Sequence, residues 1–198
     1  MIKAIIFDMG GVVLKSRTKG VPNVLLSKIK AKRAASLFEK NLKKAYKGKI
    51  STDKFFEDLS NLLNVDINSL KKQWGKSFLK KFTLNKELME IIDSLKEKRY
   101  KTALISNTTE LNAQLNKKQG FYKRFHPKLL SHEVRMMKPE ERIYRLMLKK
   151  LKLKPEQCIF TDDKKEHLAP AKRLGMKTIL FKNAEQFKKE LKRFKVRI

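Results

Sequence analysis

The sequence predicts an α/β fold in which a parallel sheet carries helices on both faces and a helical segment follows the first strand. Two observations predict this architecture. From residue 84 onward, short apolar runs alternate with amphipathic helical stretches, which is typical of strand–helix–strand units in a parallel sheet. Residues 15–83 instead have a helical pattern after a single strand. We therefore expect a core of residues 1–14 and 84–198 and an inserted helical cap of residues 15–83.

The first strand is an apolar run from Lys3 to Phe7 that ends at Asp8-Met9-Gly10-Gly11, where a tight loop is expected. Apolar residues recur at helical spacing from about Pro22 to Lys81. Ser51 precedes one of these helices and is a typical N-cap residue. Trp74 and the nearby phenylalanines are interpreted mainly as packing residues of the cap.

The core elements after Leu84 follow a regular order. Helices are expected at 86–98, from 106–108 onward, at 138–151, at 168–174 and at 184–194, and strands at 102–105, 129–130, 158–160 and 178–181. Pro139 is expected in the first turn of its helix, and Gly175 at the end of another. The order of these elements predicts that the strands are parallel.

Composition limits the classes of protein to consider. A hydrophobic fraction of 41% provides enough apolar side chains for a globular core, and no run is long enough to span a membrane. Residues 5–14 are interrupted by Asp8 and Gly10–Gly11 and so do not resemble a signal peptide. The single cysteine, Cys158, cannot form an internal disulfide, which favours a cytoplasmic protein.

The net charge of +29 is unusual. A field of this size attracts polyanions and steers phosphorylated molecules toward the protein. The lysines are spread over nearly every predicted helix rather than gathered in one arm, so a coat of solvated lysines is favoured over a nucleic-acid site. A nucleic-acid partner stays the less favoured alternative, and the sequence does not indicate an oligomeric state.

Polar residues follow several predicted strands, at the edge where parallel strands place ligand sites. Asp8 follows the first strand, Ser106-Asn107-Thr108 the second, and Asp162-Asp163 a later one, while Lys138 lies at a loop–helix junction. Clustered carboxylates repel one another, and a divalent cation relieves this repulsion. Because oxygen ligands favour Mg²⁺, the set predicts a magnesium site suited to phosphoryl transfer.

Four segments of the chain, taken together, resemble the haloacid dehalogenase (HAD) superfamily and its Rossmann-like three-layer fold. The segments are Ile5–Val12, Ile105–Thr108, Met137–Glu140 and Phe160–Asp163, in the order of the four superfamily motifs. The stretches 138–144 and 169–180 look most like the branch that contains bacterial α-glucose-1-phosphate phosphatase and the N-terminal phosphatase domain of soluble epoxide hydrolase.

This resemblance implies a role for each matching residue. Asp8 would be the nucleophile and a metal ligand, the Gly10 backbone carbonyl a second ligand, and Asp163 the third. Asp162 is the second choice for that ligand and would otherwise support the metal site or hold Lys138. Lys138 would balance the charge of phosphate and Asp8. Ser106 and Asn107 would bind the phosphate.

Two positions depart from the superfamily pattern. Most phosphatases of the superfamily have an aspartate two residues after the nucleophile, which protonates the leaving group; Gly10 stands there. His167 stands where relatives usually have Asn or Asp. It either contacts the site or is a tolerated surface residue, and the surface interpretation is slightly favoured.

The resemblance implies a Mg²⁺-dependent phosphatase that acts on a small phosphorylated metabolite, such as a sugar phosphate, through an aspartyl-phosphate. A dehalogenase on the same scaffold is one alternative, although the pair Asp162-Asp163 favours a metal. A catalytically weakened fold that binds nucleic acid is another. Residues 15–83 do not specify the substrate; Lys15, Arg17 and Trp74 are the only contacts suggested.

Overall fold

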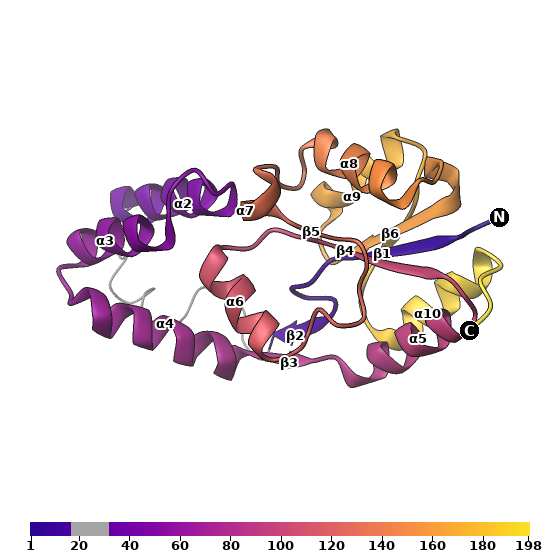
Figure 1. Cartoon of the computed structure of the whole chain (residues 1–198), viewed down its shortest axis with the longest axis horizontal. Helices are drawn as coiled ribbons and strands as arrows, with labels where there is room; N and C mark the ends of the chain where they lie inside the picture. The colour runs from indigo at the N-terminus through magenta and orange to yellow at the C-terminus, as the bar shows by residue number, and fades with distance from the viewer. Residues whose placement is uncertain (17–31) are drawn as a thin grey trace.

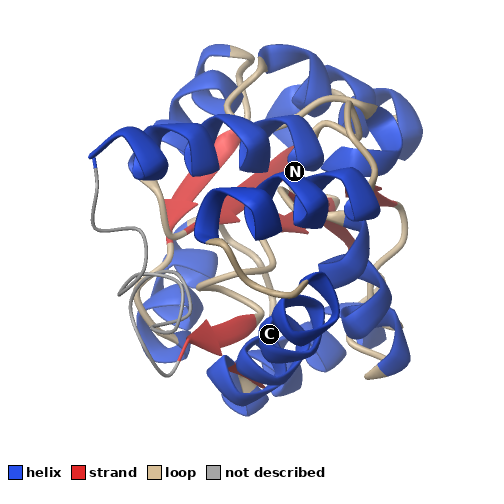
Figure 2. Cartoon of the chain, turned by 90° about the vertical axis from the view of Figure 1, so that its left-hand side faces the viewer, coloured by secondary structure: helices blue, strands red, loops and turns tan. Residues whose placement is uncertain are grey.

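A computed structural model describes residues 1–16 and 32–198 of the chain. It confirms the predicted fold class, because a sheet of five parallel strands lies between two layers of helices and a helical cap is inserted after the first strand (Figures 1 and 2). The strands of this sheet are β1 (Ala4–Phe7), β4 (Lys101–Ser106), β5 (Lys128–Leu130), β6 (Cys158–Asp162) and β7 (Lys177–Leu180). Their spatial order, β5-β4-β1-β6-β7, places the first strand in the middle.

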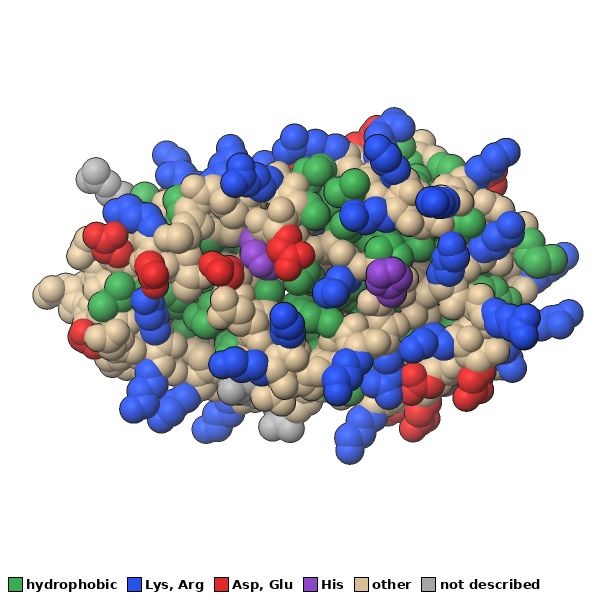
Figure 3. All heavy atoms as spheres, viewed as in Figure 1, with side chains coloured by type: hydrophobic (Ala, Val, Ile, Leu, Met, Phe, Trp, Pro, Cys, Tyr) green, Lys and Arg blue, Asp and Glu red, His purple; other side chains and the backbone are tan. Residues whose placement is uncertain are grey.

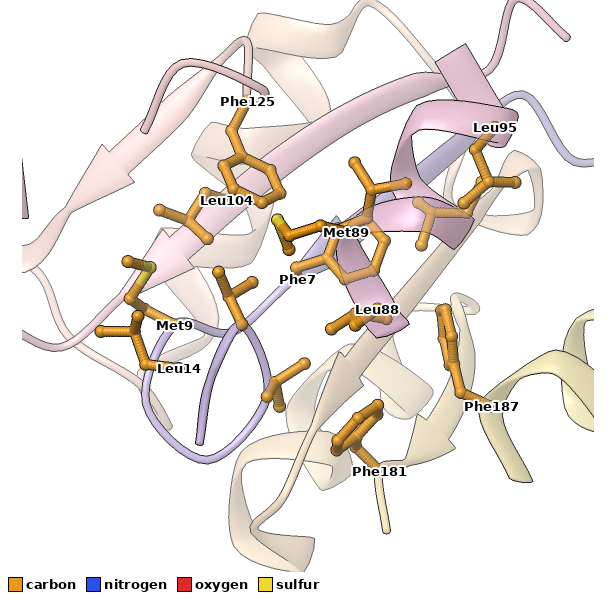
Figure 4. Packing of buried hydrophobic residues seen from close by; sticks show 14 of the residues in the cluster. Phe7, Met9, Leu14, Leu88, Met89, Leu95, Leu104, Phe125, Phe181 and Phe187 are labelled. Carbon is orange, nitrogen blue, oxygen red and sulfur yellow. The ribbon is translucent and has the colours of Figure 1, made fainter. Parts of the chain in front are cut away.

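Alternating side chains of β1 enter two separate cores, as expected for a strand covered on both faces. Ile5 and Phe7 point to the layer formed by α5 (Lys86–Glu97) and α10 (Ala184–Arg193), to which α6 (Glu110–Lys118) adds Ala113. The Phe7 ring lies 5.8 Å from Phe125 and 5.7 Å from Phe187 (Figure 4).

Ala4 and Ile6 point to the opposite layer of helices. This layer consists mainly of α8 (Glu141–Leu151) and α9 (Lys165–Arg173), which lie across the sheet from α5 and α10 in Figure 1. Two short helices complete the core, α7 (Ser131–Val134) after β5 and the 3₁₀ turn η1 (Pro155–Gln157) before β6. The central strand is therefore buried from both sides, which holds its carboxyl end in a fixed position.

The cap has an apolar core of its own. It consists of α2 (Lys32–Tyr46), α3 (Thr52–Leu63) and α4 (Ile67–Lys81), which lie together at one end of the molecule in Figure 1. The rings of Phe55, Phe56 and Trp74 meet edge to face at 5.3–5.8 Å, so their interpretation as packing residues is confirmed. Ser51 caps α3 as predicted, with its Oγ accepting from Lys54 N at 3.1 Å.

A short antiparallel ribbon joins core and cap, and the sequence pattern missed it. Its strands are β2 (Leu14–Ser16) and β3 (Phe82–Leu84). Strands of three residues are too short to show an apolar period, which explains the omission. The proposed boundaries at 14/15 and 83/84 fall within this ribbon, and the division into domains stays a prediction.

Several predicted element boundaries are wrong, and three of them lie at the site. The helix expected to open at Lys138-Pro139 begins at Glu141, because a turn closed by Glu140 N and Met137 O at 2.8 Å precedes it. The helix expected from Ser106 begins at Glu110, with Thr109 as its N-cap. Asp162 is the last residue of β6 rather than part of the loop.

The surface is basic without one dominant patch on the face shown. Lys and Arg side chains are spread over this face, with acidic groups among them (Figure 3). Within the described parts, no helix is both long and apolar enough to cross a bilayer. Arg17 and the residues predicted to be helical from Pro22 to residue 31 lie outside the described residues.

Asn85 fixes the return of the chain from cap to core. It is fully buried, its Nδ2 donates to Val12 O at 3.2 Å, and its backbone N–H donates to Val13 O at 2.9 Å. Its Oδ1 also accepts from Leu88 N at 3.4 Å, as the N-cap of α5. One side chain thus ties both chain segments between core and cap to the same helix.

We predict that Asn85→Ala lowers the free energy of unfolding by about 2–3 kcal/mol, because a helix cap and a buried hydrogen bond are lost together. Urea denaturation measures this change. The control is Asn183→Ala, the same exchange at the exposed N-cap of α10, which removes only a cap and costs about 1 kcal/mol. Equal losses in the two variants would contradict the proposed junction role.

Candidate active site

Asp8 lies directly beyond the carboxyl end of the central strand. Its backbone N–H donates to Thr161 O at 2.9 Å, which continues the β1–β6 ladder to the point where the side chain leaves the sheet. The residue is 6% exposed, so its carboxylate has lost most of its contact with bulk water. A buried carboxylate at this position needs a cationic partner.

Lys138 is that partner, and its ammonium group pairs with two carboxylates. Its Nζ donates to Asp8 Oδ1 and, at 2.6 Å, to Asp162 Oδ2. Lys138 and Asp162 are 1% and 0% exposed, so solvent screens neither contact. The structure thus brings together three of the residues predicted for the site.

Asn107 fixes the backbone of Lys138 from the neighbouring strand end. Its Oδ1 accepts from Lys138 N at 2.9 Å, and its Nδ2 donates to Lys138 O at 2.8 Å. Both ends of this amide are therefore engaged, and a direct phosphate contact from Asn107 would use the second Nδ2 hydrogen or the backbone N–H. Below the ammonium, the Phe160 ring lies 5.6 Å from Lys138 Nζ, within reach of a cation–π contact.

His167 is buried against Asp162, so its interpretation as a surface residue is wrong. Its Nδ1 lies 3.1 and 3.0 Å from Asp162 Oδ1 and Oδ2. The backbone N–H of Lys164 donates to Asp162 Oδ1 at 2.9 Å. Since Lys138 also donates to Asp162, this carboxylate already has three partners within the protein.

Asp163 lies beside the loop that follows β1, and this approach requires glycine at position 11. Gly11 has a φ of +89°, and a Cβ there would lie 2.2 Å from Asp163 Oδ2. Gly10 differs, because a Cβ at that position meets nothing within 4 Å. The loop therefore brings its backbone close to Asp163 and leaves room for a side chain one residue earlier.

The charges in this cluster shift the pKa of each carboxyl in a different direction. Burial raises the pKa of Asp8 to about 6, although the Lys138 ammonium opposes the increase. Burial would also raise the pKa of Asp162, but the Lys138 charge and the His167 hydrogen bond outweigh burial and lower this pKa to about 2. Partial burial and the charge of Asp162 raise the pKa of Asp163.

The carboxylates are close enough to share one cation. Within the described part of the chain, Asp8, Asp162 and Asp163 each offer an oxygen, and these oxygens lie within 4.8 Å of one another. Burial is the main cause of the raised pKa values of Asp8 and Asp163, and the charge of Asp162 adds to it at both residues. A hard divalent cation such as Mg²⁺ fits this donor set.

A cavity of about 760 Å³ opens above the cluster, between core and cap. Core residues Asp8, Gly10, Ser106, Lys138 and Asp163 line one part of it. The cap contributes residues of α2 and α4: Phe38, Glu39, Leu42, Lys43, Tyr46, Trp74 and Phe78. Lys15, suggested as a substrate contact, instead pairs with Glu87 at 3.2 Å.

Sequence reasoning named Asn107 as a phosphate ligand and singled out His167, but it missed how both position the cluster. It gave no role to the Phe160 ring or to Gly11. All these contacts join distant segments of the chain.

The described geometry agrees with a comparison against protein families, in which residues 2–175 match the model for haloacid dehalogenase-like hydrolases. The chain belongs to this family. It therefore has the scaffold of HAD-like hydrolases, and the resemblance seen in its four motifs is confirmed.

Two curated relatives of this HAD-like hydrolase differ in how much of each chain is matched. D-ribitol-5-phosphate phosphatase of Bacteroides thetaiotaomicron is 28% identical over 205 residues, covering 96% of this chain and 97% of the relative. Bifunctional epoxide hydrolase 2 of Sus scrofa is 31% identical over 115 residues, covering 56% of this chain but 21% of the relative. The match thus spans about a fifth of the length of that mammalian protein.

Solved structures share the fold along most of the chain. A HAD-like family hydrolase from Porphyromonas gingivalis superposes with a TM-score of 0.81 at 25% identity and covers 100% of both chains. A HAD family enzyme from Bacteroides thetaiotaomicron, solved as a magnesium complex, gives a TM-score of 0.78 at 21% identity and covers 92% of this chain and 94% of its own. A dehalogenase structure has a TM-score of 0.62 at 20% identity, with 89% and 83% coverage.

Removal of the Lys138 charge is predicted to destabilise this HAD-like hydrolase in a pH-dependent way. Lys138→Met leaves two buried carboxylates without their cation, so their pKa values rise in the folded state. A raised carboxyl pKa lowers stability as pH increases through it. We expect a loss of about 3–5 kcal/mol at pH 8 and a smaller loss at pH 5, measured by urea denaturation in metal-free buffer.

The matched control is Lys165→Met, the same exchange at an exposed position on α9. It is expected to change stability by no more than about 0.5 kcal/mol at either pH. A loss in Lys138→Met that is the same at both pH values would show that the lysine acts by packing rather than by its charge.

Proposed function

We propose that this HAD-like hydrolase is a Mg²⁺-dependent phosphatase that acts on a small phosphorylated metabolite through an aspartyl-phosphate. The observation that carries the proposal is the cluster at the carboxyl edge of the sheet. Three carboxylate oxygens lie within 4.8 Å of one another, and one buried lysine contacts two of the carboxylates. Negative charge beside a fixed cation, at the end of an open cavity, suits phosphoryl transfer.

In this mechanism Asp8 is the nucleophile. One of its carboxylate oxygens forms a bond to phosphorus as the bond between phosphorus and the ester oxygen breaks, and the ester oxygen leaves as an alkoxide that takes a proton from water to give the alcohol. Lys138 neutralises charge shared between Asp8 and the phosphate. The Ser106 hydroxyl and the N–H of Asn107 bind phosphate oxygens, and Lys138 stays in place because Asn107 holds its backbone. Water then hydrolyses the acyl phosphate and restores Asp8.

Asp8, Asp163 and the Gly10 carbonyl would hold the magnesium ion. When bound, the ion supplies charge stabilisation for the transferring phosphoryl group. Asp163 is preferred over Asp162, because Asp162 accepts hydrogen bonds from Lys138, Lys164 and His167. Asp162 would therefore hold Lys138, and Asp163 would be available to the cation.

The proposed substrate is a phosphorylated metabolite such as a sugar phosphate. D-ribitol-5-phosphate phosphatase, whose match covers 96% of this chain, acts on a compound of that kind according to its name. A net charge of +29 would draw such anions toward the protein. A screen of phosphorylated metabolites with Mg²⁺ would identify the substrate.

The lone thiol of Cys158 is buried, which fits a reducing compartment, and we propose a cytoplasmic location on that basis. Two other functions would give different results. A dehalogenase needs no metal, and a nucleic-acid-binding protein would hydrolyse no ester but bind RNA with a steep dependence on salt.

Asp8→Asn is predicted to lower kcat for any phosphate ester by roughly 10³-fold or more while the fold is retained, because an amide cannot form the acyl phosphate. Steady-state kinetics and circular dichroism measure the two effects. Asp93→Asn is the control, the same exchange at an acid that pairs with Arg124 outside the cavity. An active Asp8→Asn variant would refute Asp8 as the nucleophile.

Removal of the metal is predicted to abolish turnover reversibly. An excess of EDTA should stop hydrolysis, and added Mg²⁺ should restore it. The expected requirement follows from the three carboxylates, whose oxygens lie within 4.8 Å of one another and which share one lysine. Full turnover in excess chelator would exclude the proposed mechanism and favour metal-independent chemistry.

Gly10→Asp is predicted to raise activity toward esters with poor leaving groups. A side chain can leave the backbone there, since a Cβ meets nothing within 4 Å, and its carboxyl would supply the acid that most phosphatases of the superfamily use. We expect kcat for an alkyl phosphate to rise by about 10²-fold or more, with a smaller gain for p-nitrophenyl phosphate. Gly10→Asn is the control, because it fills the same space without a proton; an equal gain there would contradict the acid role.

A further inference from the structure

A second polar site lies in the wall of the cavity that contains Asp8. Asn116 of α6 lines this cavity and is 3% exposed. Its Nδ2 is 3.2 Å from Tyr122 Oη, whereas its buried Oδ1 has no hydrogen-bond partner among the described residues. An unpaired buried amide oxygen is costly in a folded protein and typically requires a partner.

The Tyr122 hydroxyl faces the Nδ2 end of the Asn116 amide and accepts from it. The free end of this buried amide is therefore the Oδ1 acceptor.

Asn112 adds a second free group to the same wall. It lies one helical turn before Asn116, so the two side chains are neighbours on one face of α6. Its Oδ1 accepts from Trp74 Nε1 at 3.0 Å, and because indole N–H only donates, this contact fixes the orientation of the amide. The Nδ2 donor of Asn112 is then left for a ligand, since it has no hydrogen bond within the described residues.

We propose that Asn112 and Asn116 form a subsite for a hydroxyl group on the alcohol part of the substrate. A hydroxyl both donates and accepts, so it can donate to Asn116 Oδ1 and accept from Asn112 Nδ2 at once. A carboxylate or a second phosphate only accepts and would leave Asn116 Oδ1 unpaired. The substrate class is therefore a monophosphate ester whose alcohol part carries a further hydroxyl group.

Burial of the pair favours a ligand that can replace the hydrogen bonds it loses. Asn116 is 3% exposed, so a group that reaches it gives up its hydration. A hydroxyl that meets two amides keeps its hydrogen bonds there. The subsite would therefore recognise the neutral end of the ester while Lys138 and the proposed cation bind its phosphate.

The inference rests on the proposed phosphatase function for the placement of the phosphate. The first test compares two substrates in the unmodified protein with Mg²⁺: a linear pentitol monophosphate and n-pentyl phosphate, which has the same number of carbons. We expect kcat/KM to be about 10- to 100-fold higher for the pentitol ester, because the alkyl ester leaves the amides unpaired. Equal values would overturn the subsite.

Asn116→Leu is the variant that tests the residue. It should lower this preference to within about threefold, with little change in activity toward p-nitrophenyl phosphate, which has no hydroxyl group to bind. Asn61→Leu, the same exchange at an exposed position of α3, should keep the full preference. A preference that survives Asn116→Leu would overturn the assignment.

A measurement without turnover separates the subsite from the phosphatase proposal. Free pentitol is added to the ¹⁵N-labelled protein, and the side-chain amide signals of Asn112 and Asn116 are followed by NMR. Saturable shifts are expected for both. Shifts without hydrolysis of any phosphate ester would refute the phosphatase and keep the subsite, whereas hydrolysis without such shifts would refute the subsite alone.

Discussion

A single buried ammonium group is the constraint around which the site is arranged. Lys138 reaches Asp8 across 130 positions of the sequence, and its 1% exposure means that neither charge is offset by water. Two carboxylates therefore have to remain within reach of Nζ, and the middle strands β1 and β6 supply them. Asn107, at the end of β4, holds the backbone that carries the ammonium. The sheet order meets this need, because it places β4, β1 and β6 side by side.

The local charge balance explains the division of roles among the three acids. Asp162 has a pKa of about 2 and is committed to Lys138 and His167, whereas the Asp8 carboxyl has a pKa of about 6. The Lys138 charge thus outweighs the effect of burial at Asp162 and does not outweigh it at Asp8. Asp8 and Asp163 both line the cavity between core and cap, and their oxygens are close enough to share a cation.

Much of this arrangement could be predicted from local patterns. Runs such as Lys3–Phe7 and the polar residues after them identified the strands, the fold class and the edge where Asp8, Lys138 and Asp162 meet. The ribbon of β2 and β3 could not be predicted, because pairing over three residues leaves no periodic signal. The burial of His167 and the two hydrogen bonds between the Asn107 amide and the Lys138 backbone could not be predicted either. Both depend on which distant groups the sheet brings together.

The contact between Trp74 and Asn112 has a consequence for observation of the enzyme at work. Trp74 is the only tryptophan in the chain, and its indole N–H crosses from the cap to the core helix α6. Its fluorescence therefore comes entirely from the junction of the two parts. Separation of cap and core would break this hydrogen bond and leave Nε1 to water while the ring stays packed against Phe55 and Phe56, and the emission would shift to longer wavelength. The protein thus carries an intrinsic optical reporter of cavity opening.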